Sequence, residues 1–120
     1  MTVAYDEILA DRVRDVLAGE PGLSERKMFG GLAFMLDGHM CCGLVGDRLM
    51  LRLGADEAAR ALRRPHVEPM DFTGRPMTGM VYVAADGVRG RALRLWVVKA
   101  TAFVRTLPPK RPARPEQPTR

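Results

Sequence analysis

The feature that most constrains the fold is the run of residues 32–53, in which apolar side chains recur at every second position. Two-residue turn signals divide this run: Asp37-Gly38 follows the first segment and Gly46-Asp47 follows the second. Successive side chains of a strand point to opposite faces of a sheet. The pattern therefore predicts a three-stranded antiparallel meander with one apolar face.

Segments on both sides of the meander have helical periodicity. Apolar residues three and four positions apart predict a first helix over residues 3–18, with Thr2 as its N-cap. The strong helix formers of residues 55–64 predict a second helix, and a third is expected from Gly90 to about residue 107. The core-facing residues are predicted to be Tyr5, Ile8, Leu9, Val13, Val16 and Leu17 in the first helix, and Ala92, Leu95, Trp96, Phe103 and Leu107 in the last.

Two further strands are predicted over residues 66–72 and 77–84. Because Pro69 has no N–H to donate, the first of them is expected to lie at an edge or to be irregular. The pair Gly30-Gly31 predicts a bulge or a sharp bend in the first strand of the meander. The predicted order is α-β(3)-α-β(2)-α. It implies a two-layer α+β fold, with one antiparallel sheet and helices on one face.

Composition predicts one domain, residues 1–106, followed by a flexible tail, residues 107–120, that is rich in proline and arginine. The net charge of the chain is +5. No apolar run is long enough for a membrane span, and the N-terminus does not resemble a signal peptide. Neighbouring Cys41 and Cys42 do not make a disulfide framework, so a cytoplasmic protein with reduced thiols is expected.

The stretch Arg26–Met35, RKMFGGLAFM, precedes the Asp-Gly hairpin, and Pro76-Met77 leads into a later strand. This arrangement resembles the N-terminal domain of the bacterial TfoX/Sxy family over roughly residues 3–106. The resemblance implies a two-layer α+β fold of the secretion-chaperone type. Better-known members regulate competence together with a cyclic-AMP receptor protein and carry a second, C-terminal domain, where this chain continues into its tail. The resemblance carries over no catalytic residues and no cofactor.

The sheet face without helices is expected to be apolar. Helices cover one face of the predicted sheet, so about half of the strand residues must point the other way. A methionine-rich surface adapts to varied partners, and an exposed apolar patch marks an interface. The residues expected in this patch are Ala33, Met35, Val45 and Met50. The principal hypothesis is therefore a non-enzymatic regulatory domain that binds a protein partner or a second copy of itself.

Basic residues of the last helix and the tail suggest an alternative. Clustered cations on one element are typical of nucleic-acid binding, although no helix-turn-helix, zinc-finger or RNA-recognition motif accompanies them. The residues of this candidate basic patch are Arg91, Arg94, Lys99, Arg105, Lys110, Arg111 and Arg114. The alternative is a nucleic-acid-associated accessory protein.

A third hypothesis is a small thiol- or metal-dependent enzyme or ligand-binding protein. Strand alternation predicts Cys42 in the core and Cys41 on the opposite face beside His39, which is the minimum arrangement for an activated thiol. With His66, these two residues would make three metal ligands. No convergent catalytic set is evident, so an enzyme is not the expectation. The candidate cleft comprises Arg26, Lys27, Gly30, Gly31, His39 and Cys41.

Overall fold

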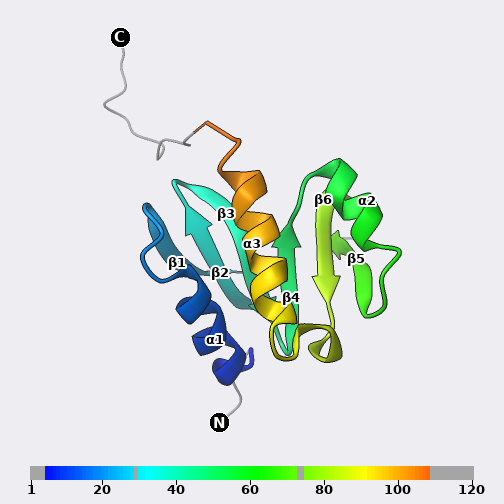
Figure 1. The fold of residues 1–120 in the computed structure, drawn as a ribbon, viewed down its shortest axis with the longest axis horizontal. Helices are drawn as coiled ribbons and strands as arrows, with labels where there is room; N and C mark the ends of the chain where they lie inside the picture. Colours follow the sequence, from blue (N-terminus) through cyan, green and yellow to red (C-terminus); the bar gives the residue numbers. More distant parts are fainter. Residues whose placement is uncertain (1–4, 29, 73–74, 109–120) are drawn as a thin grey trace.

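A computed structural model of the chain describes residues 5–28, 30–72 and 75–108 (Figure 1). These residues form three α-helices on one face of a six-stranded antiparallel sheet. The helices are α1 (Glu7–Leu17), α2 (Ala55–Ala61) and α3 (Ala92–Val104), and a short 3-10 helix, η1 (Ala85–Val88), leads into α3. The strands are β1 (Leu23–Met28), β2 (Gly31–Leu36), β3 (His39–Val45), β4 (Arg48–Arg52), β5 (Val67–Phe72) and β6 (Arg75–Val83).

The strand order across the sheet is β1-β2-β3-β4-β6-β5. The predicted α+β class with one antiparallel sheet is confirmed. The predicted number of strands is wrong by one, because residues 23–28 form a separate strand and the order is α-β(4)-α-β(2)-α. Gly30, at a φ of 72°, turns the chain so that Met28 pairs with Gly31. The paired glycines therefore join two strands of a hairpin and do not bend a single strand.

The two turns of the predicted meander are confirmed. Asp37 and Gly38, which join β2 to β3, have φ angles of 51° and 86°. Two consecutive positive φ angles are the signature of the turn that matches the twist of paired strands. Gly46, the first turn residue between β3 and β4, has a φ of 61°. These turns set the register in which β2, β3 and β4 pair.

Helix α1 begins later than its periodicity predicts. The side chain of Asp6 accepts hydrogen bonds from the backbone N–H groups of Ile8, at 2.9 Å, and Leu9, at 3.1 Å, so Asp6 is the N-cap. The predicted cap, Thr2, lies outside the described residues. The backbone N–H of Asp6 donates to the carbonyl of Gly46, which fixes the start of α1 beside the β3–β4 turn.

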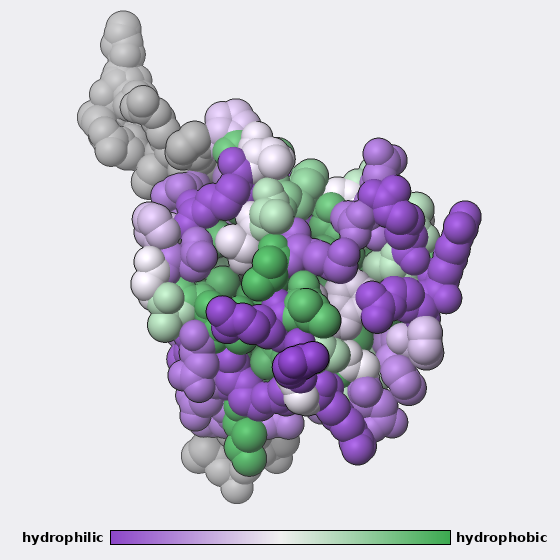
Figure 2. Space-filling view, viewed as in Figure 1, coloured by the Kyte–Doolittle hydropathy of each residue, from purple (hydrophilic) through white to green (hydrophobic). Residues whose placement is uncertain are grey.

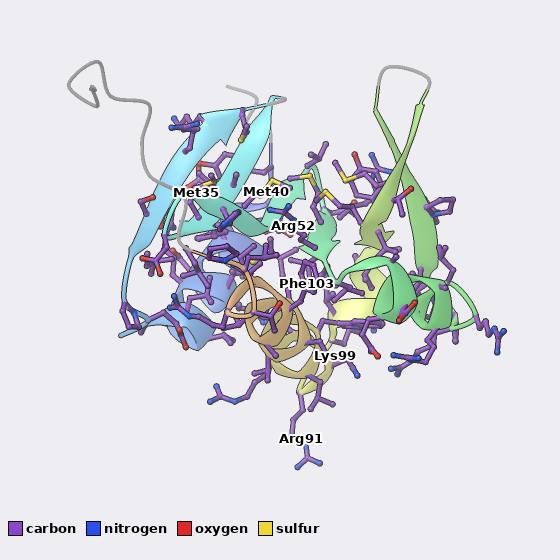
Figure 3. The ribbon with its side chains drawn as sticks, turned by 90° about the horizontal axis from the view of Figure 1, so that it is seen from above. Met35, Met40, Arg52, Arg91, Lys99 and Phe103 are labelled. Carbon is purple, nitrogen blue, oxygen red and sulfur yellow. The ribbon has the colours of Figure 1, made fainter. Side chains whose placement is uncertain are left out.

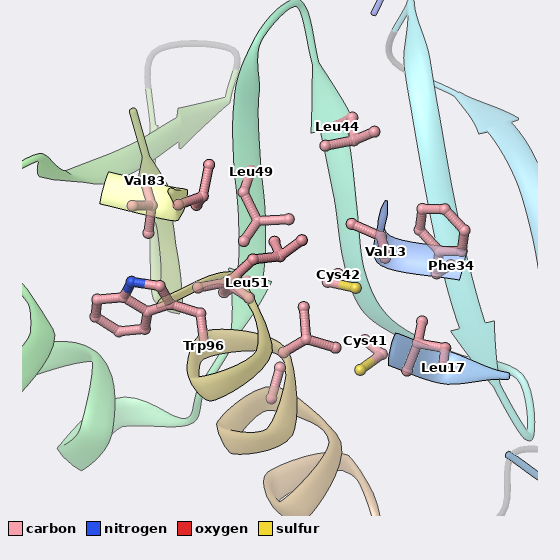
Figure 4. Close-up of a cluster of buried hydrophobic side chains, with 14 of the residues drawn as sticks. Val13, Leu17, Phe34, Cys41, Cys42, Leu44, Leu49, Leu51, Val83 and Trp96 are labelled. Carbon is pink, nitrogen blue, oxygen red and sulfur yellow. The ribbon is translucent and has the colours of Figure 1, made fainter. Parts of the chain in front are cut away.

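The main core lies between the helices and the sheet (Figure 4). Helix α1 contributes Val13 and Leu17, and α3 contributes Trp96, which are all nearly inaccessible to solvent. Three predicted core residues are not part of it: Ile8 is 76% exposed, Leu95 is 64% exposed, and Leu107 is partly buried outside the cluster. Both helices are apolar on more than one side, so periodicity alone does not select the buried side.

The edges of the sheet are protected in different ways. Strand β1 lies at one edge, and its Glu25, Arg26 and Lys27 are exposed. Strand β5 lies at the other edge and contains Pro69, so the predicted edge position of that strand is confirmed. Charged side chains and proline on edge strands oppose pairing with the strands of another molecule.

An ion pair attaches α1 to β1 and predicts a pH effect. Arg14 donates from Nε and Nη2 to the two carboxylate oxygens of Glu25, at 2.7 and 2.8 Å. This hydrogen bonding lowers the pKa of Glu25 from its usual 4.5. A lowered carboxyl pKa stabilises the fold above the pKa of the unfolded chain, and the contribution is lost as the pH falls through the folded-state pKa. Solvent screens the pair, so the contribution is at most about 1 kcal/mol.

We therefore expect Glu25→Gln to lower the free energy of unfolding slightly at pH 7 and to have no effect well below the folded-state pKa. Urea titrations at both pH values measure this difference. The exposed neighbour Lys27 provides a control, because Lys27→Gln should not change the acid dependence. A Glu25→Gln variant whose pH dependence matched the wild type would show that the pair does not contribute.

Candidate interaction surfaces

The sheet is strongly curved. Seen from above, the β1–β2 and β5–β6 hairpins both extend away from α3, on the side where the helices are absent (Figure 3). Met35 and Met40 lie on this side, whereas Phe103, Lys99 and Arg91 lie on the side of the helices. We call this helix-free side the methionine face; its core is the cluster Met50, Met70 and Met80, with Met40, Val45 and Tyr82 packed around it.

The methionine face is not the exposed patch that the sequence predicts. Ala33, Met35, Val45 and Met50 occupy helix-free positions, as expected, but Ala33 and Met50 are fully buried and Met35 is only 9% exposed. Val45 is partly buried. Twist and curvature of a sheet bring side chains of non-neighbouring strands together on its inner side. The methionines consequently pack as a second core.

The centre of this second core depends on the absence of a side chain at Gly43. Gly43 pairs with Ala33 on one side and with Met50 on the other. A Cβ at position 43 would lie 2.6 Å from Met50 Cε and 2.5 Å from the Leu32 carbonyl oxygen. The Met50 side chain therefore lies across β3, in space that the side chain of any residue larger than glycine at position 43 would occupy.

Part of the methionine face is covered by polar and aromatic side chains. The guanidinium of Arg48 lies 3.9 Å from the centre of the Tyr82 ring, a cation–π contact. The same guanidinium approaches the carboxylate of Glu68 at 3.8 Å. These residues come from β4, β6 and β5, so the contacts join three adjacent strands over the apolar cluster.

Exposed apolar side chains gather instead on α3. Leu95 is 64% and Val98 is 50% exposed, and Ala102 is exposed one turn further on. Spacings of three and four residues place all three on one side of the helix. In the space-filling view, apolar side chains lie over the middle of α3 with hydrophilic side chains around them (Figure 2). We call Leu95, Val98 and Ala102 the outer stripe of α3.

Some residues of the candidate basic patch form ion pairs with carboxylates of the domain, and others do not. Lys99 Nζ lies 3.2 Å from Glu57 Oε2, which ties α3 to α2. Arg105 donates to Asp37, at 3.0 Å, and to Glu20, at 2.8 Å. Arg91 and Arg94 are exposed and form no ion pair within the part of the chain that the structure describes. Lys110, Arg111 and Arg114 lie outside the described residues.

The candidate ligand cleft is not assembled. Gly30 and Gly31 lie at one end of β2, whereas His39 pairs with Leu36 at the other end. Five residues of extended strand separate these ends by roughly 16 Å. Arg26 and Lys27 are exposed on edge strand β1. The β1–β2 hairpin, which the sequence pattern did not reveal, places the glycines at its turn, at the opposite end of β2 from His39.

His39 is engaged by other groups. Its Nε2 donates to the carbonyl oxygen of Pro108 at 2.7 Å, and Arg52 Nη1 lies 3.5 Å from its Nδ1. The described residues hold no hydrogen bond between His39 and Cys41, and no group of three or more His, Cys, Asp or Glu side chains there could hold a metal ion. His66 is exposed at the start of β5. The three proposed metal ligands are therefore not brought together.

The two cysteines do not point to opposite faces as predicted. The β2–β3 register shifts so that Phe34 pairs with Cys42 and Met35 pairs with Met40, which leaves Cys41 as an extra residue. Such a bulge interrupts the alternation of a strand. Both thiols consequently lie in the main core, and neither is accessible to solvent (Figure 4). Both cysteines are free.

The fold and these surfaces define a small two-layer α+β domain with exposed apolar residues on its last helix. A family model, the TfoX N-terminal domain, matches residues 15–104, and the chain belongs to this family. The resemblance inferred from the residues around Gly30-Gly31 is thereby confirmed. No curated protein matches the sequence. Among the described residues, none of the helices has the length and apolarity to cross a membrane.

The outer stripe of α3 was missed by the sequence pattern, which assigned Leu95 to the core. The available signal was the high apolar content of the whole helix: its buried side already holds Leu93, Trp96 and Val97. A helix with more apolar residues than one buried side can accommodate must expose some of them. Leu95 and Val98 are the apolar residues of α3 that its buried side does not accommodate.

Proposed function

We propose that this chain is a non-enzymatic regulatory domain that binds a protein partner through the outer stripe of α3. The observation that carries the proposal is the exposure of Leu95 and Val98 on a helix whose opposite side fills the core. Exposed apolar side chains that are contiguous on one element are typical of protein interfaces. Because the helix is held rigidly against the sheet, the stripe is preorganised for binding.

Charge indicates the chemistry of the partner. Arg91 and Arg94 are exposed beside the N-terminal end of the outer stripe. Helix α3 contains no acidic residue, so a second copy docked through α3 would offer these cations no opposite charge. A different protein with apolar side chains next to carboxylates fits the stripe better. Self-association, which the sequence also suggested, is therefore the less favoured form of the same function.

The nucleic-acid alternative has weaker support. Lys99 and Arg105 already neutralise carboxylates of the domain, so a phosphate would have to displace them. Binding to duplex DNA that falls steeply with salt, and that Arg91→Glu and Arg94→Glu abolish, would favour this alternative over a protein partner.

The proposal is tested by site-specific photo-crosslinking in the cells that produce the protein. A benzophenone amino acid at position 98 should give a discrete protein adduct, and the same amino acid at position 8 should not. Ile8 is a matched control because it is also apolar, 76% exposed and helical.

Once the crosslinked partner has been identified, its affinity for the domain can be measured. Leu95→Glu should weaken this affinity by at least about tenfold, since the new charge would be desolvated at the centre of the interface. Ile8→Glu should leave the affinity unchanged, and light scattering should report a monomer for all variants. Equal binding by Leu95→Glu and the wild type, or an adduct consisting only of a second copy, would reject a hetero-partner on this stripe.

A further inference from the structure

The bulge in β3 creates an unusual pair of thiols. Adjacent residues of a regular strand point to opposite faces, but Cys41 and Cys42 both contribute to the core between the sheet and the helices. Figure 4 shows both sulfur atoms on this side of β3. The described contacts give the pair no ligand and no role in the proposed interaction surface, which lies on the outer side of α3.

Cys41 is linked to α3 through Thr101. Its Sγ lies 3.7 Å from Thr101 Oγ1, and the Thr101 hydroxyl donates to the Val97 carbonyl at 2.9 Å. A hydroxyl has a single hydrogen, so in this state the Cys41 thiol is the donor to Oγ1. When Cys41 ionises, rotation of the hydroxyl allows Thr101 to donate to the sulfur instead.

The two thiols differ in acidity. Hydrogen bonding from the Cys42 thiol, followed by that from Thr101, lowers the pKa of Cys41. The reciprocal hydrogen bond, together with complete burial, raises the pKa of Cys42 well above its usual value. A thiol with a lowered pKa beside a second thiol with a raised pKa resembles the pairing of a redox cysteine with a resolving cysteine.

From this geometry we propose that Cys41 and Cys42 are a redox pair that reacts with hydroperoxides to form a vicinal disulfide. The Cys41 thiolate attacks the terminal oxygen of the hydroperoxide, which breaks the O–O bond and leaves a sulfenic acid on Cys41; the alkoxide that leaves, or hydroxide in the case of hydrogen peroxide, takes up a proton to become the alcohol or water. The Cys42 sulfur then attacks the sulfenic sulfur; the S–S bond forms, the S–O bond breaks and water leaves. Overall, two thiols and one hydroperoxide give one disulfide, one water and one alcohol, or two waters from hydrogen peroxide.

The resulting disulfide would be labile. Adjacent Cα atoms lie about 3.8 Å apart across a trans peptide bond, whereas disulfides usually join Cα atoms roughly 4.4–6.8 Å apart. Strain of this kind makes a disulfide easily reduced, as in regulatory disulfides. Since both thiols are buried, the oxidant reaches Cys41 only when the adjoining part of α3 opens locally, so the reaction is gated by the fold.

The test begins with the reduced wild-type protein, hydrogen peroxide as the probe, and peptide mapping after alkylation in denaturant. We expect the peptide that holds both cysteines to lose two hydrogen atoms and to escape alkylation, and dithiothreitol to restore both thiols. Two thiols that remain available for alkylation, a disulfide between two chains, or irreversible oxidation of Cys41 would each overturn the proposal.

Variants assign the roles of the two cysteines. In Cys42→Ser, a sulfenic acid on Cys41 should be trapped by dimedone, whereas in Cys41→Ser the Cys42 thiol should remain reduced. Thr101→Val, which keeps the shape of the side chain, should slow oxidation roughly tenfold because a hydrogen bond to the thiolate is lost. Unchanged kinetics in Thr101→Val would reject activation from α3, and wild-type mapping decides the disulfide itself if a cysteine variant fails to fold.

Discussion

Replacing Met50 by alanine should lower the free energy of unfolding by about 2–5 kcal/mol, as for a large side chain removed from a core. Met50 belongs to the methionine face and has no solvent-accessible surface. Its terminal methyl group lies over Gly43, where no side chain is available to fill the space that truncation would leave. The expected loss is that of a core residue, although no helix covers this side of the sheet.

Urea denaturation followed by tryptophan fluorescence measures this effect. Trp96 is the single tryptophan of the chain and is buried against η1, where its Nε1 donates to the Gly87 carbonyl at 3.2 Å. Leu95→Ala serves as the control, because an exposed residue should change the stability by no more than about 0.5 kcal/mol. If both variants unfolded at the same urea concentration, the methionine face would be a surface and the interface inferred from the sequence would regain support.

Replacing Phe34 by alanine should have a still larger effect, about 3–5 kcal/mol. Phe34 is the aromatic residue three positions after Gly31 in the segment that resembles the TfoX/Sxy family. In the structure it is fully buried on the helix side of β2, near Val13 and Leu17 of α1 (Figure 4). Its presence in the motif therefore has a structural explanation: it fills the space between the sheet and the first helix.

A conservative replacement separates packing from any specific role of the ring. Phe34→Leu keeps most of the volume, so its cost should remain below about 1.5 kcal/mol. Both variants can be followed by Trp96 fluorescence, since neither change removes the tryptophan. Equal losses in Phe34→Ala and Phe34→Leu would mean that the aromatic ring itself is required at this position.

Local chemistry made much of the fold predictable. Asp37-Gly38 and Gly46-Asp47 permit only a few turn conformations, so they determined the β2–β3–β4 meander in advance. Pro69 likewise identified an edge strand, since it has no N–H to offer a neighbour. The features around Gly30 were harder, because a glycine pair is compatible with a bulge, a bend or a hairpin turn, and only the pairing of residues 23–28 distinguishes them.

The candidate sites were less predictable, because they depend on tertiary geometry. One extra residue in β3 moved Cys41 from the expected outer face into the core. Curvature of the sheet buried Met50, which alternation had correctly placed on the helix-free side. Leu95 is exposed because of the orientation of α3 about its own axis when it packs against the sheet. Register shifts, curvature and helix rotation are not encoded in the spacing of apolar residues alone.

The charged rim at β1 and the proline at β5 limit how this domain can assemble. Neither border of the sheet offers an uninterrupted, uncharged row of backbone groups to another chain. Growth of one continuous sheet across several molecules is therefore disfavoured even at high cellular concentration. Under the proposed function, a partner would have to be bound through side-chain complementarity, so substitutions on the surface of α3 could change the choice of partner while the pairing of the strands stays the same.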